Sequence, residues 1–270
     1  MTFDTSTKLF LWCNMGYGDT IIMIPIINKV LEKYKDVKIT VGVFKHHAYL
    51  FEHLPVNIVP VDLHFMIRYI PFDIYMPEFH YSINMWAGKR AGKELKFWWK
   101  IFVDIFNLEC KENKLDYFID YGKMWGEIQL PIYNVDVKNN SIFVENGDCI
   151  SGQNDFKLDV NEFAHLYPNL NFYCTADPSI DAPNVFYNAN NSLIDHQNIL
   201  RNCKGFIGKG SGPSHLNYLH CLDQMPKALF GYKLKEQNII WDERVNYQYL
   251  DGSHQAIKDF LNANYHKFVF

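Results

Sequence analysis

The chain of 270 residues is long enough to bury one large core or two modest ones. A hydrophobic content of 48% with 21% charged residues is typical of a folded globular protein and excludes a disordered one. The formal net charge of −4 argues against a general nucleic-acid-binding protein, because such proteins are usually basic, so we expect no nucleic-acid partner.

The cysteines and the apolar segments indicate a reducing, intracellular setting. The six cysteines show neither CxxC pairs nor zinc-ligand spacing, so we expect free thiols and no metal site. The first residues lack a basic segment followed by an apolar one, which predicts no signal peptide. The longest apolar run, residues 21–27, is too short to cross a bilayer. Together these features predict a cytoplasmic protein.

The first half of the chain begins with a strand–helix–strand unit. Residues 8–13 are typical of a buried strand, a turn containing Gly16 and Gly18 follows, and an apolar helix is expected over residues 20–34. A second strand at 38–44 completes the unit, which predicts a parallel sheet. The further elements expected are short β segments at 57–63 and 72–77, a helical, aromatic and basic region at 86–106, and a crossover at 116–140.

A second α/β half is expected after residue 140. Its predicted strands are residues 141–145, 171–174, 184–187, 206–207 and 227–230. Its predicted helices are residues 160–166, 192–202 and 253–263. The sequence therefore predicts two α/β domains, residues 1–140 and 141–270, with a cleft between them and with the terminal helix in the second domain or packed back on the first. Both glycine turns follow strands, at the carboxyl-terminal ends where such sheets bind ligands.

Residues 205–219 carry the strongest candidate binding site. An apolar strand runs into a turn with glycines at 208, 210 and 212 and with Pro213, and a helix is predicted to begin at Ser214. Free N–H groups and the positive end of a helix dipole suit a diphosphate. His215 adds a titratable donor. A glycine-rich turn that binds nothing is the alternative.

Two segments resemble the ADP-heptose–lipopolysaccharide heptosyltransferases of glycosyltransferase family nine. The first is GYGDTIIMIPIINKVLEKYKDVKITVGV, which is similar to the opening strand, G-D turn and helix of that family. The second is NILRNCKGFIGKGSGPSHLNYLHCL, which is similar to its donor-site pattern, G-x-D-S/T-G-x-x-H-L. The resemblance implies a GT-B fold of two Rossmann-like domains, with an acceptor-binding N-terminal domain and a C-terminal domain that binds a nucleotide sugar.

The resemblance also implies an activity. It predicts an inverting, metal-independent glycosyltransferase that uses no cofactor and transfers a sugar from a nucleotide-diphosphate sugar to a glycan, lipid or other hydroxyl acceptor. Asp19 falls on the position of the family's proposed catalytic base, and Gly16, Tyr17 and Gly18 lie on the acceptor side. The alternative for Asp19 is a helix-capping role, for which aspartate is also well suited.

On the donor side, the resemblance implies a diphosphate-binding turn and supporting polar residues. The diphosphate would be held by Gly210, Ser211, Gly212 and Pro213. His215 would also reach a phosphate, and the alternative for His215 is a helix-capping or core-packing role. Lys157 falls where the family carries a phosphate-binding lysine, although a solvated surface lysine is equally compatible. Asp177 is placed to meet a ribose hydroxyl or to form a turn before Pro178.

One departure concerns the sugar. The family typically carries an aspartate where this chain has Gly210, and that aspartate holds sugar hydroxyls of the donor. Its loss predicts either a donor other than ADP-heptose or a degenerate site.

Residues 88–106 allow two interpretations. Basic residues followed by aromatic ones at near-helical spacing could contact an anionic membrane or a lipid acceptor, which would place the protein at the inner face of the membrane. Buried core is the alternative, because aromatic stripes usually pack inward.

Two other functions stay open from the sequence. A non-catalytic member of the fold is favoured by Gly210. A dinucleotide-dependent oxidoreductase would use the glycines at 16 and 18, but Ile21 stands where a third glycine is needed and no acidic residue closes the strand at 38–44.

Overall fold

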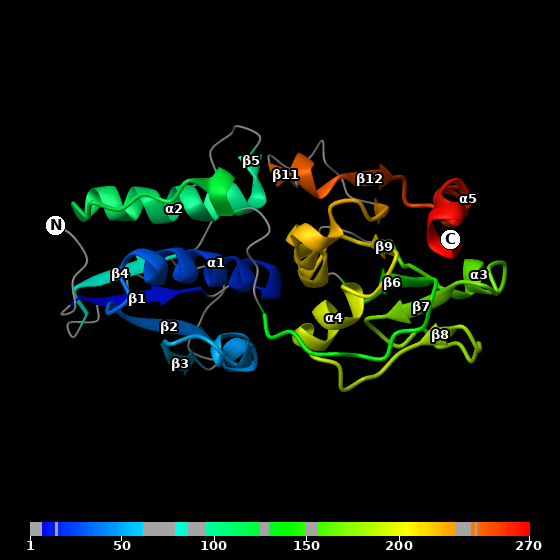
Figure 1. Ribbon diagram of the computed structural model, residues 1–270, viewed down its shortest axis with the longest axis horizontal. Coiled ribbons are helices and arrows are strands. Elements are labelled where there is room, and N and C mark those ends of the chain that lie inside the picture. The colour runs from blue at the N-terminus through cyan, green and yellow to red at the C-terminus, as the bar shows by residue number, and fades with distance from the viewer. Residues whose placement is uncertain are drawn as a thin grey trace. The chain divides into compact units, whose positions relative to one another are not determined.

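The chain divides into two compact units (Figure 1). The computed structural model describes residues 7–13, 16–61, 79–85, 96–124, 130–148, 156–230, 239–240 and 242–270. Unit 1 comprises Met1–Leu130 and Asn238–Ile240, and unit 2 comprises Pro131–Gln237 and Trp241–Phe270. The division precedes the expected boundary at 140 because Asn198 in unit 2 holds the intervening segment: its Oδ1 accepts from Tyr133 N at 3.1 Å and its Nδ2 donates to Pro131 O at 3.0 Å.

Unit 1 is built on a four-stranded parallel sheet. Its strands are β1 (Lys8–Trp12), β2 (Lys38–Phe44), β3 (Asn57–Val61) and β4 (Tyr81–Asn84), in the order β3-β2-β1-β4. The sheet confirms the predicted strand–helix–strand opening. The strand predicted at 72–77 lies outside the described residues.

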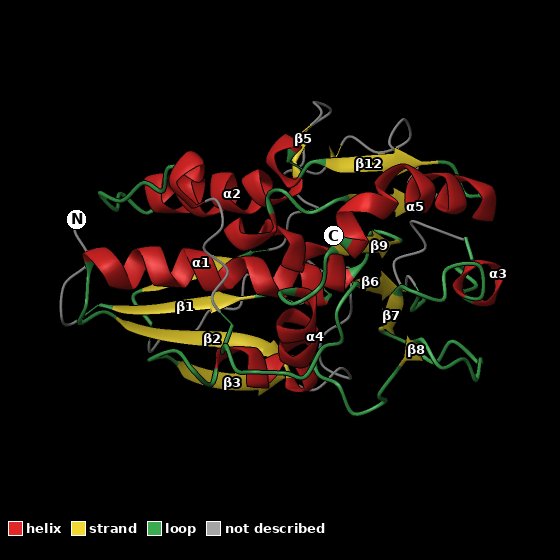
Figure 2. Ribbon diagram, turned by 45° about the vertical axis from the view of Figure 1, so that its right-hand side comes forward, coloured by secondary structure: helices red, strands yellow, loops and turns green. Residues whose placement is uncertain are grey.

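Two helices cover one face of this sheet. They are α1 (Tyr17–Lys33) and α2 (Trp98–Glu112). Figure 2 shows α1 alongside β1 and β2, with α2 beyond it. Every residue from Gly18 to Ile27 is buried, as expected for an apolar helix covered on two sides.

Three aromatic residues of α2 lie in the interior of unit 1. Trp99, Phe102 and Phe106 are buried, which favours the core interpretation of residues 88–106 over membrane contact. Residues 88–95 of that segment lie outside the described part of the chain. Among the helices that the structure describes, none is both long and apolar enough to span a bilayer.

Unit 2 contains a six-stranded parallel sheet. Its strands are β6 (Ser141–Glu145), β7 (Asn171–Cys174), β8 (Val185–Phe186), β9 (Gly205–Gly208), β10 (Lys227–Phe230) and β12 (Tyr247–Leu250), in the order β12-β10-β9-β6-β7-β8. Numbered within the unit, the order is 3-2-1-4-5-6 when read from β8, which is the Rossmann order. The last strand, β12, has half-exposed residues and was not predicted.

A small sheet joins the two distant parts of unit 1. It pairs β5 (Lys96–Phe97) with β11 (Ile239–Ile240) in parallel. The chain thus contributes a strand to unit 1 from a point in the sequence that follows most of unit 2.

The helices of unit 2 are α3 (Asn161–Ala164), α4 (Leu193–Leu200) and α5 (His254–Val269). A capping box between Ser192 and Asp195 begins α4. The terminal helix α5 buries Ile257, Phe260 and Phe268 in the core of unit 2, so it packs on its own unit.

The side-chain amide of Asn184 bonds to the backbone of the segment that joins α3 to β7. Its Nδ2 donates to the carbonyl oxygens of Ala164 at 3.1 Å, Tyr167 at 3.2 Å and Leu170 at 3.0 Å. The side chain is buried, so these carbonyl groups have little access to water.

We therefore expect Asn184→Ala to lower the free energy of unfolding by about 2 kcal/mol, because it removes the amide donor from the buried carbonyl group of Leu170, while those of Ala164 and Tyr167 keep backbone donors. Urea unfolding measures the change. The exposed Asn190→Ala is the matched control and should change stability by less than about 0.5 kcal/mol. Equal effects of the two substitutions would contradict the assignment.

Candidate active site

Both glycine turns lie where the strand order of a sheet reverses. In unit 1 the first turn follows β1, which lies between β2 and β4. In unit 2 the second turn follows β9, which pairs with β6. Open parallel sheets bind ligands beyond the carboxyl-terminal ends of their strands at these reversal points. Each unit therefore carries one of the predicted turns at its expected binding position.

In unit 1, Asp19 lies in the first turn of α1. The N-cap residue of α1 is Gly16, and the helix begins at Tyr17. Asp19 is therefore the third helical residue and not the cap. Thr20 Oγ1 donates to Gly16 O at 3.1 Å and fixes the turn. Asp19 is 8% exposed. An acidic residue here also stabilises the helix, because the helix N-terminus carries a partial positive charge.

Aromatic rings gather beside this turn. The Tyr17 ring lies 4.0 Å from the His47 ring, and Tyr17 Oη donates to His46 O at 3.2 Å. His47 is buried and its Nδ1 lies 3.0 Å from Thr20 Oγ1. Burial, with a smaller contribution from His46, lowers the pKa of His47 to about 3, so this imidazole is neutral at physiological pH. The turn between β1 and α1 is thus packed against the residues that follow β2.

In unit 2, the glycine turn differs from its prediction at the helix start. After β9 the chain continues through Lys209 and reaches Gly210 with a φ of 81°, a left-handed conformation that favours glycine. Ser211 then begins a 3-10 helix, Gly212–Tyr218, instead of an α-helix at Ser214. The predicted helix start is therefore wrong, and the short helix supplies no extended dipole.

A carboxyl group from β6, the strand beside β9 in the sheet, bonds to the turn. Glu145, the last residue of β6, has no exposed surface. It accepts hydrogen bonds from Ser211 N at 2.9 Å and from the hydroxyl groups of Ser211 and Ser214. Burial raises the pKa of Glu145, and the serine donors and the charge of Lys209 act against that rise. Glu145 was not predicted as a site residue.

Strand register places Glu145 beside the turn. Glu145 pairs with Gly208 across the β6–β9 ladder. A Cβ atom on Gly208 would lie 2.5 Å from Glu145 Oε2 and 2.4 Å from Phe206 Cζ. The glycine at 208 therefore provides the space that the carboxyl group fills.

His215 faces the interior of unit 2. It is 7% exposed, and burial lowers its pKa to about 3. It is therefore a neutral imidazole at physiological pH, so any contact with a phosphate would be a hydrogen bond and not an ion pair.

Lys157 and Asp177 lie at the same end of the unit 2 sheet as the turn. Phe156 packs on Phe230, the last residue of β10, with ring centroids 6.2 Å apart, which places the exposed Lys157 near that end. Asp177 follows β7, and its Oδ1 accepts from Ser179 N at 2.8 Å. The turn role expected for Asp177 is therefore present, and its ribose role stays a prediction.

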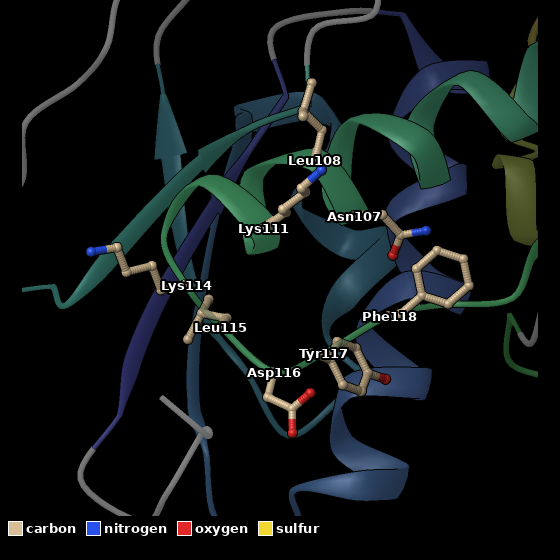
Figure 3. A pocket seen from close by; sticks show the side chains of 8 residues that line it. All are labelled: Asn107, Leu108, Lys111, Lys114, Leu115, Asp116, Tyr117 and Phe118. Atoms are coloured by element: carbon tan, nitrogen blue, oxygen red, sulfur yellow. The ribbon is translucent and has the colours of Figure 1, made fainter.

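A surface hollow of about 540 Å³ lies beside the C-terminal end of α2 (Figure 3). Its walls include Lys111, Asp116 and Tyr117. Tyr117 Oη donates to the carbonyl of Lys29, about 15 Å along α1 from Asp19. The hollow thus lies toward the other end of α1, and we do not include it in the candidate site. Among the described residues, no group of three His, Cys, Asp or Glu side chains could hold a metal ion.

No protein-family model and no curated protein matches this sequence. Solved structures do match its fold. A glycosyl transferase family 9 protein from Veillonella parvula is 12% identical, with 100% of this chain and 94% of that chain covered and a TM-score of 0.58. The Escherichia coli heptosyltransferase WaaC, solved with ADP, is 12% identical, with 97% and 99% covered and a TM-score of 0.61. The iron-containing dodecameric glycosyltransferase TibC of Escherichia coli is 14% identical, with 86% and 60% covered and a TM-score of 0.52.

These likenesses concern the fold. Together with the two parallel sheets, they confirm the predicted α/β class with Rossmann-like units of the GT-B type. The cleft between the units stays a prediction.

The left-handed backbone at Gly210 generates a stability prediction. Gly210→Ala should lower the free energy of unfolding by about 1 kcal/mol or more, because a Cβ disfavours a positive φ. Gly147→Ala is the matched control, since its Cβ would meet only ordinary contacts at 3.7 and 3.8 Å. Chemical denaturation of both variants provides the measurement, and a tolerated Gly210→Ala would contradict the turn geometry.

Buried histidines generate a pH prediction. Burial lowers the pKa of His47 and His215 to about 3 and that of His196 to about 4. Unfolded histidine titrates near 6.5, so below about pH 6.5 the unfolded chain binds more protons and stability falls, by up to about 1.4 kcal/mol per pH unit for each histidine. Urea unfolding at several pH values in this range measures how the free energy of unfolding depends on pH. In His196→Leu the slope of this dependence should be shallower than in the wild-type protein by the equivalent of one proton. The exposed Asn190→Ala, which removes no titratable group, should leave the slope unchanged.

Proposed function

We propose that the protein is a glycosyltransferase that moves a sugar from a nucleotide-diphosphate sugar to a hydroxyl group of a glycan, lipid or other acceptor. The observation that carries the proposal is the position of both glycine turns, each at the strand-order reversal of its own parallel sheet. The shared fold with WaaC, which was solved with ADP, supports the same assignment.

Asp19 is the proposed general base. Its carboxylate would take the proton of the acceptor hydroxyl while that oxygen attacks the anomeric carbon of the donor. The bond from the anomeric carbon to the diphosphate oxygen breaks, the nucleoside diphosphate leaves with the electron pair, and the configuration inverts. Gly16, Tyr17 and Gly18 would form the acceptor side of this step. The inverting, metal-independent character comes from the resemblance in sequence.

The second unit would bind the donor. Its glycine turn would meet the diphosphate, and the exposed Lys157 could neutralise part of the growing negative charge. Asp177 would contact the ribose. In this proposal the acceptor and the donor are held by different units.

A non-catalytic, nucleotide-binding protein is the second candidate. Glu145 favours it, since the carboxyl group already occupies the Ser211 N–H and two hydroxyl groups of the turn. Turnover of any nucleotide sugar would exclude this candidate. We also propose a cytoplasmic location, on the sequence features alone.

The test begins with calorimetric titration of ADP, UDP, GDP and CDP, followed by a transfer assay with sugars of the nucleotide that binds. Asp19→Asn should lower kcat by about 100-fold or more, because the base is lost, while nucleotide affinity stays within about 2-fold.

Asp36→Asn, an exposed carboxyl group beyond the other end of α1, is the matched control and should keep full activity. Full activity of Asp19→Asn would overturn the assigned base. Failure of all nucleotides to bind the wild-type protein would overturn the proposed function itself.

A further inference from the structure

A buried carboxyl group bonds to the glycine turn of unit 2, residues 208–214, which we call the donor turn. Glu145 has no exposed surface, yet it accepts from one backbone N–H and two serine hydroxyl groups of the turn. A buried carboxyl group is costly unless donors surround it, so these bonds are a condition of its presence there.

Further hydrogen bonds restrain the turn, including one from β12. Tyr247 Oη, from β12, donates to the carbonyl of Ser214 at 2.7 Å, and Asn217 Nδ2 donates to the same carbonyl at 3.3 Å. Ser214 N donates to Ser211 O at 3.0 Å. Ser211 and Ser214 are therefore bound on both their side chains and their backbones.

These bonds change which groups of the turn can reach an anion. In the stretch from Ser211 to Ser214, the first N–H donates to Glu145 and the last donates to a carbonyl. Pro213 has no N–H. Direct contact with a phosphate from this stretch therefore falls to Gly212, and neither serine hydroxyl points to solvent as a free donor.

We propose that Glu145, Ser211 and Ser214 form one positioning unit, in which Ser211 acts on a bound diphosphate by shaping the turn through Glu145 and not by touching the phosphate. This inference rests on the proposed function, because it concerns the donor turn of that site. It makes Glu145 and Ser214 positioning residues and changes the role expected for Ser211.

The first measurement needs no ligand. Hydrogen–deuterium exchange of the backbone N–H groups in the peptide covering residues 209–219 should be about 10-fold or more faster in Glu145→Gln than in the wild-type protein, because weaker bonds to Ser211 and Ser214 let the turn open. Glu162→Gln, the same chemical change on the exposed face of α3, should leave the exchange unchanged. Unchanged exchange in Glu145→Gln would overturn the positioning unit.

The second measurement is a double-mutant cycle on nucleoside diphosphate affinity. Ser211→Ala and Glu145→Gln should each weaken binding by about 5-fold, and the double variant by about 5-fold as well, since both break one unit. A double variant weakened by about 25-fold would show independent contributions, and would overturn the proposal in favour of direct phosphate contact by Ser211. If Glu145→Gln fails to fold, Ser211→Ala with Ser214→Ala gives the same cycle.

The two measurements separate the inference from the proposed function. Absence of binding by ADP, UDP, GDP or CDP in the wild-type protein would overturn the function and the binding role of the unit. Hydrogen–deuterium exchange in the ligand-free protein would still support or overturn the inference that Glu145 restrains the turn.

Discussion

The pairing of β6 with β9 is the constraint on which the second half of the molecule depends. Parallel strands bring their carboxyl-terminal ends to the same end of the sheet, and this register sets Glu145 opposite Gly208. A buried carboxyl group in that place needs several donors, and the serines of the following turn supply them. The shape of the turn therefore follows from strand register as much as from its glycines.

Burial imposes a related constraint on the first unit. Because α1 is covered by both the sheet and α2, the start of the helix is drawn into the interior, and Asp19 has little exposed surface. The neighbouring His47 is kept neutral by the same burial. Packing thus restrains the polar groups at this end of the sheet, and under the proposed function this restraint would provide the preorganisation that transition-state stabilisation requires.

The apolar elements could be predicted from the sequence because their signals are local. Runs such as KITVGVF and SIFVE have the length and composition of buried strands, and glycine turns mark their ends. The role of Glu145 could not be predicted in this way. Its partners, Ser211 and Ser214, lie more than sixty residues along the chain, and only the strand order brings them together. A single acidic residue ending an otherwise apolar strand was the one signal available.

The charges around the donor turn bear on the absence of an aspartate at position 210. The chain has Gly210 where the family that it resembles carries an aspartate. A carboxyl group is still present beside the turn, because Glu145 at the end of β6 supplies one that is buried. Lys209 is buried and its charge acts on Glu145, so it is already partly compensated. A diphosphate at this turn would need a positive charge from elsewhere. Lys157 is exposed near the same end of the sheet, so under the proposed function its charge would contribute more to donor binding than the turn sequence alone implies.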